Sequence, residues 1–181
     1  LDGPRLLSWA RRAAEELERR RHEINQLNVF PVPDADTGSN MAQTMAAAVE
    51  EASKNSVAQS MQEVAEALAV GAIRGARGNS GVVLSQVIRG VAQTADEEAR
   101  SGQFIANALA QAVQFVDRAI ADPVEGTVIT VLRAASTAAT QVLNEHGGEA
   151  SALSIAQAAT EAAQTALART PSQLEALRQA G

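Results

Sequence analysis

The chain is organised around one stretch, which reads Leu27-Asn28-Val29-Phe30-Pro31-Val32-Pro33-Asp34-Ala35-Asp36-Thr37-Gly38-Ser39-Asn40-Met41. Prolines, carboxylates, hydroxyls and amides crowd together here without helical periodicity. Phe30 and Val32 each precede a proline, which pushes both residues out of the α region. Apolar residues return at helical spacing with Met41, Met45 and Val49. The stretch therefore predicts a stiff, extended loop that leads into a helix.

Two carboxylates, Asp34 and Asp36, stand just before the predicted helix start. Carboxylate oxygens are ligands that hard cations prefer, and a helix start offers free N–H groups to an anion. Metal and phosphate could therefore meet at this point. Asp and Ser are also ordinary N-cap and turn residues, so simple capping is the alternative interpretation.

Composition limits the class of protein. A chain of 181 residues with 46% hydrophobic and 2% aromatic residues suits one domain whose core is built from alanine and aliphatic side chains. Cysteine is absent, which excludes disulfides and thiolate zinc sites and gives no argument for secretion, so we expect a cytoplasmic protein. No apolar run is long enough for a membrane span.

The charge pattern argues against nucleic-acid binding. The net charge is −6, and Lys54 is the only lysine. An acidic chain with few aromatic residues lacks the basic surface that neutralises a phosphate backbone. A P-loop lysine is also unavailable, so any nucleotide phosphates would have to be held by metal, backbone N–H groups, hydroxyls and an arginine.

Hydrophobic spacing predicts an all-α protein, an eight-helix antiparallel up-and-down barrel or bundle in a single domain. No segment alternates long enough to predict a strand. Pro171 is expected to end the seventh helix, and Ser172 to cap the eighth. The predicted segments run from Leu6 to about Leu27, Asn40 to Ala52, Val57 to Ile73, Asn79 to Val91, Phe104 to Ile120, Val128 to Val142, Leu153 to Leu167, and over Leu174–Leu177.

Three polar loops follow odd-numbered helices in this scheme, at residues 25–40, 75–81 and 122–127. In an up-and-down array such loops lie at the same end, which is where a bundle would hold a ligand. The second loop, Gly75-Ala76-Arg77-Gly78-Asn79-Ser80-Gly81, lets backbone approach a ligand, although its glycines could serve helix packing alone. Arg77 could pair with phosphate, with Asp34 or with Glu125. Thr127 could bond a nucleotide or cap the next helix.

Three stretches of the sequence, taken together, resemble one known protein family. The first stretch, together with Gly75-Ala76-Arg77-Gly78-Asn79-Ser80-Gly81-Val82-Val83-Leu84-Ser85-Gln86 and Pro123-Val124-Glu125-Gly126-Thr127, resembles the nucleotide-binding domain of bacterial fatty acid kinase. That domain is similar to the ADP-binding L subunit of dihydroxyacetone kinase, and the resemblance covers essentially the whole chain. It implies an all-α barrel that holds ATP or ADP with Mg²⁺ at one end.

The resemblance also implies roles for individual residues. Asp34 and Asp36 would ligate magnesium, and Asn28 lies near where relatives place a further ligand. The phosphates, ribose and nucleoside would be contacted by Thr37, Ser39, Asn40, Asn79, Ser80 and Thr127. The implied phosphate acceptor is a fatty acid presented by a separate fatty-acid-binding protein. The full-length protein could form a homodimer, and residues 1–181 would be a truncated piece that binds nucleotide without full activity.

One departure from the family is Ala35, where the family usually has glycine between the two aspartates. If that position needs a positive φ, alanine there costs on the order of 1 kcal/mol. Two other functions stay open: an L-type dihydroxyacetone kinase subunit with fixed ADP, and a helical scaffold that binds a metal without catalysis. The proline-rich lead-in to Asp34 favours the fatty acid kinase branch over the first of these.

Overall fold

A computed structural model of the chain describes residues 2–54, 60–95 and 101–180, and these residues form helices joined by turns and loops. No strand occurs in these three ranges, which confirms the all-α prediction. The chain divides into two compact units, Leu1–Glu97 and Glu98–Gly181, called here the first and the second unit. Closure of all the helices into one barrel, and the single nucleotide-binding domain, stay predictions.

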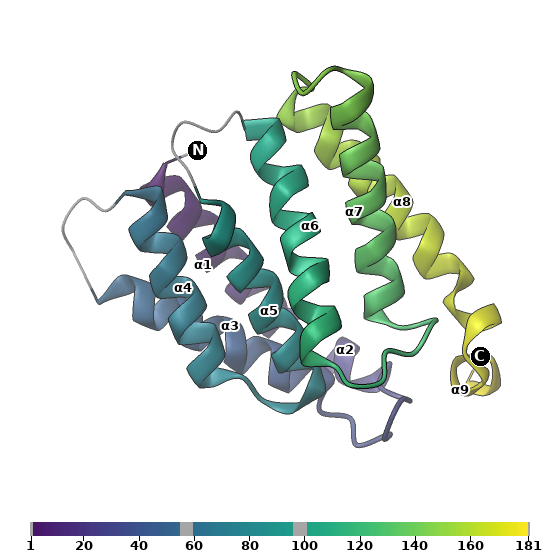
Figure 1. Cartoon of the computed structure of the whole chain (residues 1–181). Coiled ribbons are helices and arrows are strands. Elements are labelled where there is room, and N and C mark those ends of the chain that lie inside the picture. The colour runs from purple at the N-terminus through teal and green to yellow at the C-terminus, as the bar shows by residue number, and fades with distance from the viewer. Residues whose placement is uncertain (1, 55–59, 96–100, 181) are drawn as a thin grey trace. The chain divides into compact units, whose positions relative to one another are not determined.

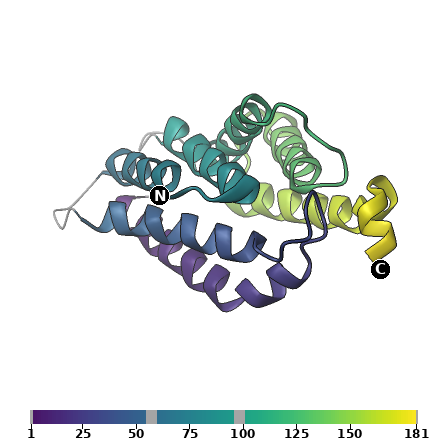
Figure 2. The same cartoon turned by 90° about the horizontal axis from the view of Figure 1, so that it is seen from below.

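The first unit is built on three long helices, α3, α4 and α5, with α1 packed against α3 and α4 and with α2 packed against α3 (Figure 1). Only two residues join α4 to α5, so these helices run antiparallel, and α3 and α5 begin at the same end. Figure 2 shows the loop that leads into α3. The bounds are α1 Gly3–Arg19, α2 Arg21–Gln26, α3 Thr37–Ser53, α4 Met61–Gly75 and α5 Gly78–Thr94.

The second unit pairs α6 with α7 and α7 with α8, while α9 contacts the end of α8 (Figure 1). Its core is formed mainly by alanines around Ile155, which is fully buried, and Leu143. Gly147 and Gly148 both have positive φ after α7, as expected for a helix end at this pair. The bounds are α6 Ser101–Ala119, α7 Val128–Glu145, α8 Ala152–Gln173 and α9 Glu175–Ala180.

Small residues bring α3 and α4 into close contact, as the alanine-rich composition predicts. Ala48, Ala65 and Ala72 are completely buried. A Cβ added at Gly71 would clash with the carbonyl of Ala47, and one added at Gly75 would clash with the Ala47 side chain. The two helix backbones therefore approach more closely than larger side chains would allow.

The first predicted helix is divided in two, which corrects the prediction of one continuous helix. The chain leaves helical geometry at Arg20, which has a ψ of 5°, and α2 then runs only to Gln26. This break turns α2 onto the start of α3, with which it packs. The start of α3 is Thr37 rather than Asn40, and α4 begins at Met61 after a Ser60 capping box, while the predicted start at Val57 lies outside the described residues.

Pro171 does not end α8, contrary to prediction; the helix continues to Gln173 with the proline inside it. Proline lacks the N–H that would bond the carbonyl four residues earlier, which belongs to Leu167. Here the hydroxyl of Thr170 donates to that carbonyl at 2.8 Å, so the acceptor is satisfied. Ser172 likewise bonds back to the carbonyl of Arg169 instead of capping the last helix. The hydroxyl of Thr170 thus supplies the hydrogen bond that the proline cannot donate.

Candidate functional site

The first two predicted loops, residues 25–40 and 75–81, meet in the first unit, where the starts of α3 and α5 lie side by side. The Ser80 hydroxyl donates to the carbonyl of Thr37 at 3.4 Å. A Cβ at Gly78 would clash with the Asn40 amide, and one at Gly81 would lie 2.5 Å from the Thr44 hydroxyl. Gly78 also has a φ of +58°, which glycine adopts without strain. Glycine is therefore needed at 78 and 81 for the second loop to reach the first.

Neither of these helix starts is capped by the residue at its own N-cap position. Asp36 precedes α3 and Arg77 precedes α5, and neither side chain accepts a bond from its helix. Among the described residues, the N–H groups of Gly78, Asn79 and Ser80 have no protein acceptor. Adjacent helix starts with free N–H groups form a positive region that suits an anion such as phosphate.

The carboxylates come from the non-helical segment before α3. Asp34 is exposed and accepts a 2.6 Å hydrogen bond from the Asn28 amide, whereas Asp36 is half-buried. Within the part of the chain that the structure describes, the Asp36 side chain has no hydrogen-bond or ion-pair partner, and no cluster of three or more His, Cys, Asp or Glu side chains could hold a metal. Any cation here would be held by these two carboxylates and oxygens from elsewhere.

Ala35, between the two aspartates, has a φ of +56°. This is the left-handed region, which costs an L-residue about 1 to 2 kcal/mol. The sequence analysis made the cost of alanine depend on whether this position needs a positive φ, and the structure shows that it does. The turn between the carboxylates is therefore held in a conformation that glycine would adopt more easily.

Asn25, on α2, is the residue that sequence reasoning missed. Its side-chain oxygen accepts from the Ser39 N–H at 3.1 Å, and its amide donates to the Ser39 hydroxyl at 3.0 Å. It therefore caps α3 from a different helix. Asn25 stands 14 residues before Ser39, and the connection between α2 and α3 brings the two together, so no local sequence pattern could have identified this contact.

Arg77 is exposed, and its guanidinium donates to the neighbouring carbonyl of Ala76 at 3.1 Å. It forms no ion pair with Asp34 in the described ranges, so that alternative from the sequence is not realised. The chain's single lysine, Lys54, is paired with Glu51 at 2.7 Å. Arg77 is the one basic side chain in the sequence of the two loops, residues 25–40 and 75–81, and its guanidinium is available to an anion.

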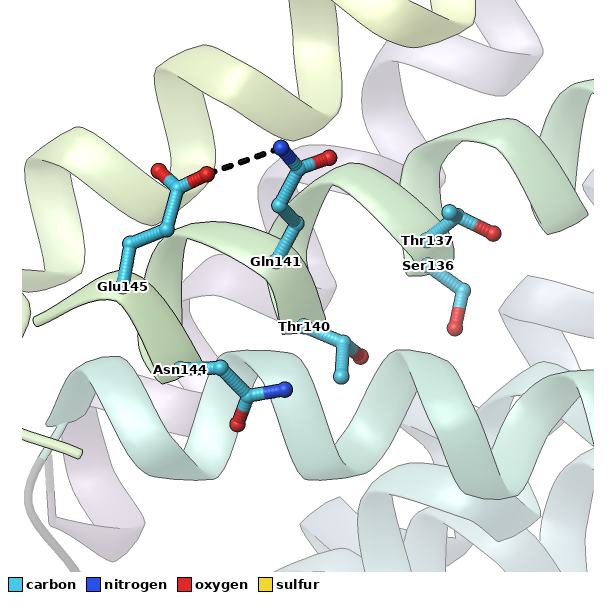
Figure 3. Close-up of a pocket in the computed structure, with 6 residues that line it drawn as sticks. All are labelled: Ser136, Thr137, Thr140, Gln141, Asn144 and Glu145. Atoms are coloured by element: carbon cyan, nitrogen blue, oxygen red, sulfur yellow. Dashed lines mark hydrogen bonds between the residues drawn. The ribbon is translucent and has the colours of Figure 1, made fainter. Parts of the chain in front are cut away.

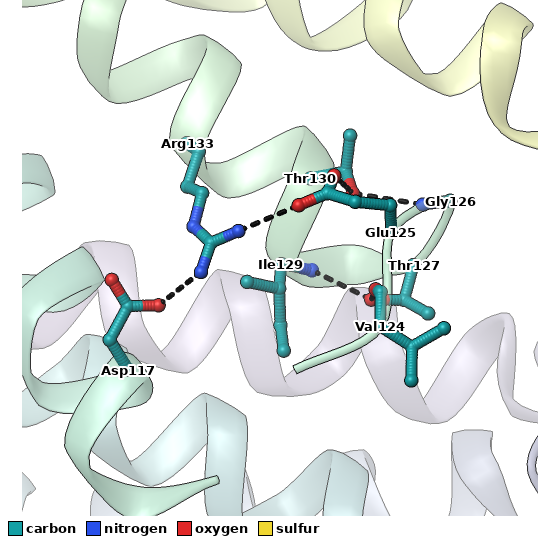
Figure 4. A network of polar contacts seen from close by, with 8 residues as sticks. All are labelled: Asp117, Val124, Glu125, Gly126, Thr127, Ile129, Thr130 and Arg133. Carbon is teal, nitrogen blue, oxygen red and sulfur yellow. Dashed lines mark hydrogen bonds and ion pairs between the residues drawn. The ribbon is translucent and has the colours of Figure 1, made fainter. Parts of the chain in front are cut away.

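The third predicted loop, residues 122–127, belongs to the second unit, where Glu125, Gly126 and Thr127 all form hydrogen bonds (Figure 4). Thr127 caps α7, accepting from the Ile129 N–H at 3.4 Å and donating to the carbonyl of Val124 at 2.8 Å. Glu125 bonds Arg133 and Thr130 at 2.8 and 2.6 Å. The hydrogen bond that Arg133 donates to Asp117, together with the interaction with Glu125, raises the pKa of Arg133. Capping by Thr127 is confirmed, and its contact with a nucleoside stays a prediction.

An open cavity of roughly 470 Å³ lies along α7, and none of its lining residues is one predicted for the site (Figure 3). Its lining is uncharged except for Glu145, whose carboxylate accepts from Gln141 at 2.8 Å. The six lining residues are Ser136, Thr137, Thr140, Gln141, Asn144 and Glu145. This cavity offers no cation and no free carboxylate pair, so it is not the phosphate site.

Comparisons with known proteins identify the family of the chain. The chain is 37% identical over 183 residues to protein YloV of Bacillus subtilis and 36% identical over 183 residues to an uncharacterized protein of Staphylococcus saprophyticus; each alignment covers the whole chain. The chain spans about a third of the length of these relatives, 32% in both cases. Among the described residues, no helix is long and apolar enough to cross a bilayer. The model of the DAK2 domain matches residues 31–181, and the chain therefore belongs to the DAK2 domain family.

Proposed function

We propose that this chain is the Mg²⁺–nucleotide-binding domain of a kinase that phosphorylates a fatty acid. The observation that carries the proposal is the meeting of two helix starts, α3 and α5, beside a loop that bears two carboxylates. The DAK2 family supports nucleotide binding and a relation to kinases. The finer assignment to fatty acid kinase rests on the proline-rich motif before Asp34.

The donor set fits magnesium. Mg²⁺ is usually held by one or two carboxylates, with water and substrate phosphates completing its octahedral shell. Asp36 has a free carboxylate, and Asp34 keeps one oxygen outside its bond to Asn28. In that bond the Asn28 nitrogen faces Asp34, so Asn28 would become a ligand only after its amide turns over to present oxygen. Asp34 and Asp36 are accordingly the main metal ligands in the proposal, and Asn28 the third.

The phosphates would lie against the two helix starts. Thr37 and Asn40 lie in the first turn of α3. Asn79 and Ser80 lie in the first turn of α5, and the N–H groups of these two residues are free. The Ser39 hydroxyl accepts from Asn25 and keeps its own hydrogen for a phosphate oxygen. Thr127, whose hydroxyl hydrogen is already used, could only accept a bond from the nucleoside.

The charge balance assigns a part to Arg77. A nucleoside triphosphate carries about four negative charges, and Asp34 and Asp36 add two more. One Mg²⁺ offsets only two of these, and Arg77 is the only basic side chain in the two loops. We therefore place its guanidinium on a phosphate group, where it can donate two parallel hydrogen bonds to two oxygens.

In phosphoryl transfer the protein mainly positions the groups and neutralises developing charge. Bound Mg²⁺ would supply most of that charge stabilisation. The chain's own residues would orient the phosphates, and the acceptor would be the carboxylate of a fatty acid presented by a separate fatty-acid-binding protein. Because the relatives are about three times longer, complete transfer, any homodimer and the cytoplasmic setting belong to the proposal for the longer protein.

Thermal unfolding with Mg²⁺, with ATP, with both and with neither tests the proposal. A ligand that binds only the native state raises the unfolding temperature. We expect a clear rise with ATP plus Mg²⁺ and little with either alone. A rise with metal alone would indicate the structural metal scaffold, and ADP that copurifies and resists dialysis would indicate the L-type dihydroxyacetone kinase function. No response to any addition would contradict nucleotide binding.

A further inference from the structure

The start of α3 combines two features that do not normally occur together. Asp36 occupies the N-cap position, where aspartate usually accepts a hydrogen bond from the second or third N–H of the helix. Its side chain makes no such bond. The third N–H, that of Ser39, is instead bonded at 3.1 Å by Asn25 from α2.

We propose that Asn25 is a positioning residue that caps α3 in place of Asp36 and thereby leaves the Asp36 carboxylate free for the cation. This inference rests on the proposed function, because it gives Asp36 its role as metal ligand. The inference adds Asn25, which is not among the predicted site residues, and explains its position by the helix cap that it supplies. The Asn25 oxygen accepts from the Ser39 N–H of α3, and the Asp36 carboxylate remains available to the cation.

The local backbone agrees with this division. Asp36 has φ −116° and ψ −8°, which is an αR conformation rather than the extended conformation of a capping residue. Gly38 is buried against α2, and a Cβ there would clash with the carbonyl of Arg21 and lie 2.9 Å from the Asn25 oxygen. The glycine therefore permits α2 to come close enough for Asn25 to reach the Ser39 N–H.

Without Asn25 the Ser39 N–H would lack an acceptor, and Asp36 is the nearest residue in sequence that can supply one. A carboxylate that bonds its own helix is turned toward that N–H and away from a cation. Asn25 and Asp36 thus compete for one donor. Removing Asn25 should move Asp36 into the capping role, which preserves the helix and weakens metal–nucleotide binding.

The experiment compares Asn25→Ala and Asn25→Asp, with Gln26→Ala as the control, since Gln26 is an exposed neighbour on the same short helix. Calorimetry measures the dissociation constant of ATP with Mg²⁺ and with EDTA. Loss of a group that orients a metal ligand typically weakens binding by about 10-fold or more, which is the effect expected for Asn25→Ala with Mg²⁺. Asn25→Asp keeps an acceptor at the same reach but loses the donor to the Ser39 hydroxyl and adds a negative charge, so it should recover only part of the affinity that Asn25→Ala loses. Gln26→Ala should bind like the wild type.

A second measurement uses the protein without nucleotide. Asp36→Ala leaves the Asn25 cap in place, and Asn25→Ala allows Asp36 to take over, so each single variant should unfold near the wild-type denaturant concentration. The double variant has neither acceptor and should lose more stability than the two single losses combined. Competition for one N–H predicts this excess, and a merely additive loss would overturn the inference.

The outcomes separate the two proposals. If the wild type binds ATP with Mg²⁺ and Asn25→Ala binds equally well, the inference fails and the proposed function stands. If Asn25→Asp restores neither the affinity lost in Asn25→Ala nor the stability that the Asp36→Ala background loses with Asn25→Ala, capping is not the role of this residue, and the inference also fails. If the wild type binds no nucleotide, the proposed function fails, and the stability of the double variant still decides whether the two residues compete. Should Asn25→Ala not fold, Asn25→Gln, whose amide lies one methylene farther out, replaces it against Asn25→Asp.

Discussion

Two loops of this protein look alike in sequence and differ in their structure. Asp34–Asn40 places two carboxylates, a glycine and two hydroxyls at the start of α3, and Glu125–Thr127 places one carboxylate, a glycine and a hydroxyl directly before α7. In the second unit these groups are used up, because Glu125 bonds Arg133 and Thr130, and Thr127 caps α7. In the first unit the Asp36 carboxylate has no partner among the described residues, and α5 begins with free N–H groups.

The difference teaches how to tell a capping loop from a binding loop. A turn that serves only the fold satisfies its own donors and acceptors, since an unpaired polar group costs stability. A turn that serves a ligand keeps some of them open and obtains its stability from elsewhere, here from Asn25. The sequence shows which groups are present, and only the structure shows which of them are already engaged.

The largest effect is expected from the carboxylates. Asp34→Asn and Asp36→Asn should each weaken binding of ATP with Mg²⁺ by about 100-fold, as expected for loss of a direct metal ligand, and should leave helicity unchanged. Calorimetry and circular dichroism measure both quantities. Glu125→Gln is the matched control: it removes an exposed ion pair worth at most about 1 kcal/mol and should not affect this affinity. Unchanged affinity in both aspartate variants would exclude them as ligands.

A second comparison uses two glycines with nearly equal backbone angles. Gly78 has φ +58° and touches the Asn40 amide, whereas Gly147 has φ +60° and no atom within 4 Å of an added Cβ. Replacement by alanine should cost each about 1 kcal/mol of unfolding free energy for the backbone. Gly78→Ala should lose more, and should also weaken nucleotide binding, because it displaces Asn40. Equal stability losses and wild-type affinity would show that the contact between the two loops is unimportant.

The third test concerns the satisfied loop. Thr127→Ala removes the cap of α7 and should cost about 1 kcal/mol in denaturant unfolding. Thr127→Ser retains the hydroxyl and should restore that stability. A loss of affinity in the alanine variant that serine also restores would support a contact with the nucleoside. Stability loss with unchanged affinity would leave Thr127 with capping alone and remove it from the proposed site.

The smallest expected effect is a gain. Ala35→Gly relieves a left-handed alanine and should raise the unfolding free energy by about 1 kcal/mol, since glycine adopts a positive φ freely. Thermal or urea unfolding measures the gain. If Ala35→Gly instead lowers stability, the turn between the aspartates does not hold the φ of +56° in solution.

The sequence predicts the helices well where apolar spacing is regular, and less well where tertiary contacts decide. The extended proline segment, the close alanine packing and the glycine turn after α7 all follow from local chemistry. The bend at Arg20 could not be predicted, because no glycine or proline marks it. The continuation of α8 through Pro171 also depends on a single hydroxyl, that of Thr170.

The site divides in the same way. The motif at Asp34 and Asp36 and the turn at Gly78 identify the residues, and the order of the helices predicts that the first two loops meet. The cap supplied by Asn25 is invisible in the sequence because it joins residues on different helices. The need for glycine at position 38 is likewise evident only once α2 is seen to lie against it.

The tight approach of α4 to α3 at Gly71 and Gly75 has a further consequence. Glycine and alanine have no side-chain rotamers, so this contact cannot be loosened or tightened by repacking. The contact fixes the position of α4 relative to α3. Because only two residues join α4 to α5, it also fixes where α5 begins. The distance between the two helix starts is thus set before any ligand arrives. A nucleotide that binds at the two helix starts therefore meets a preorganised site, and little binding free energy is lost to ordering the protein.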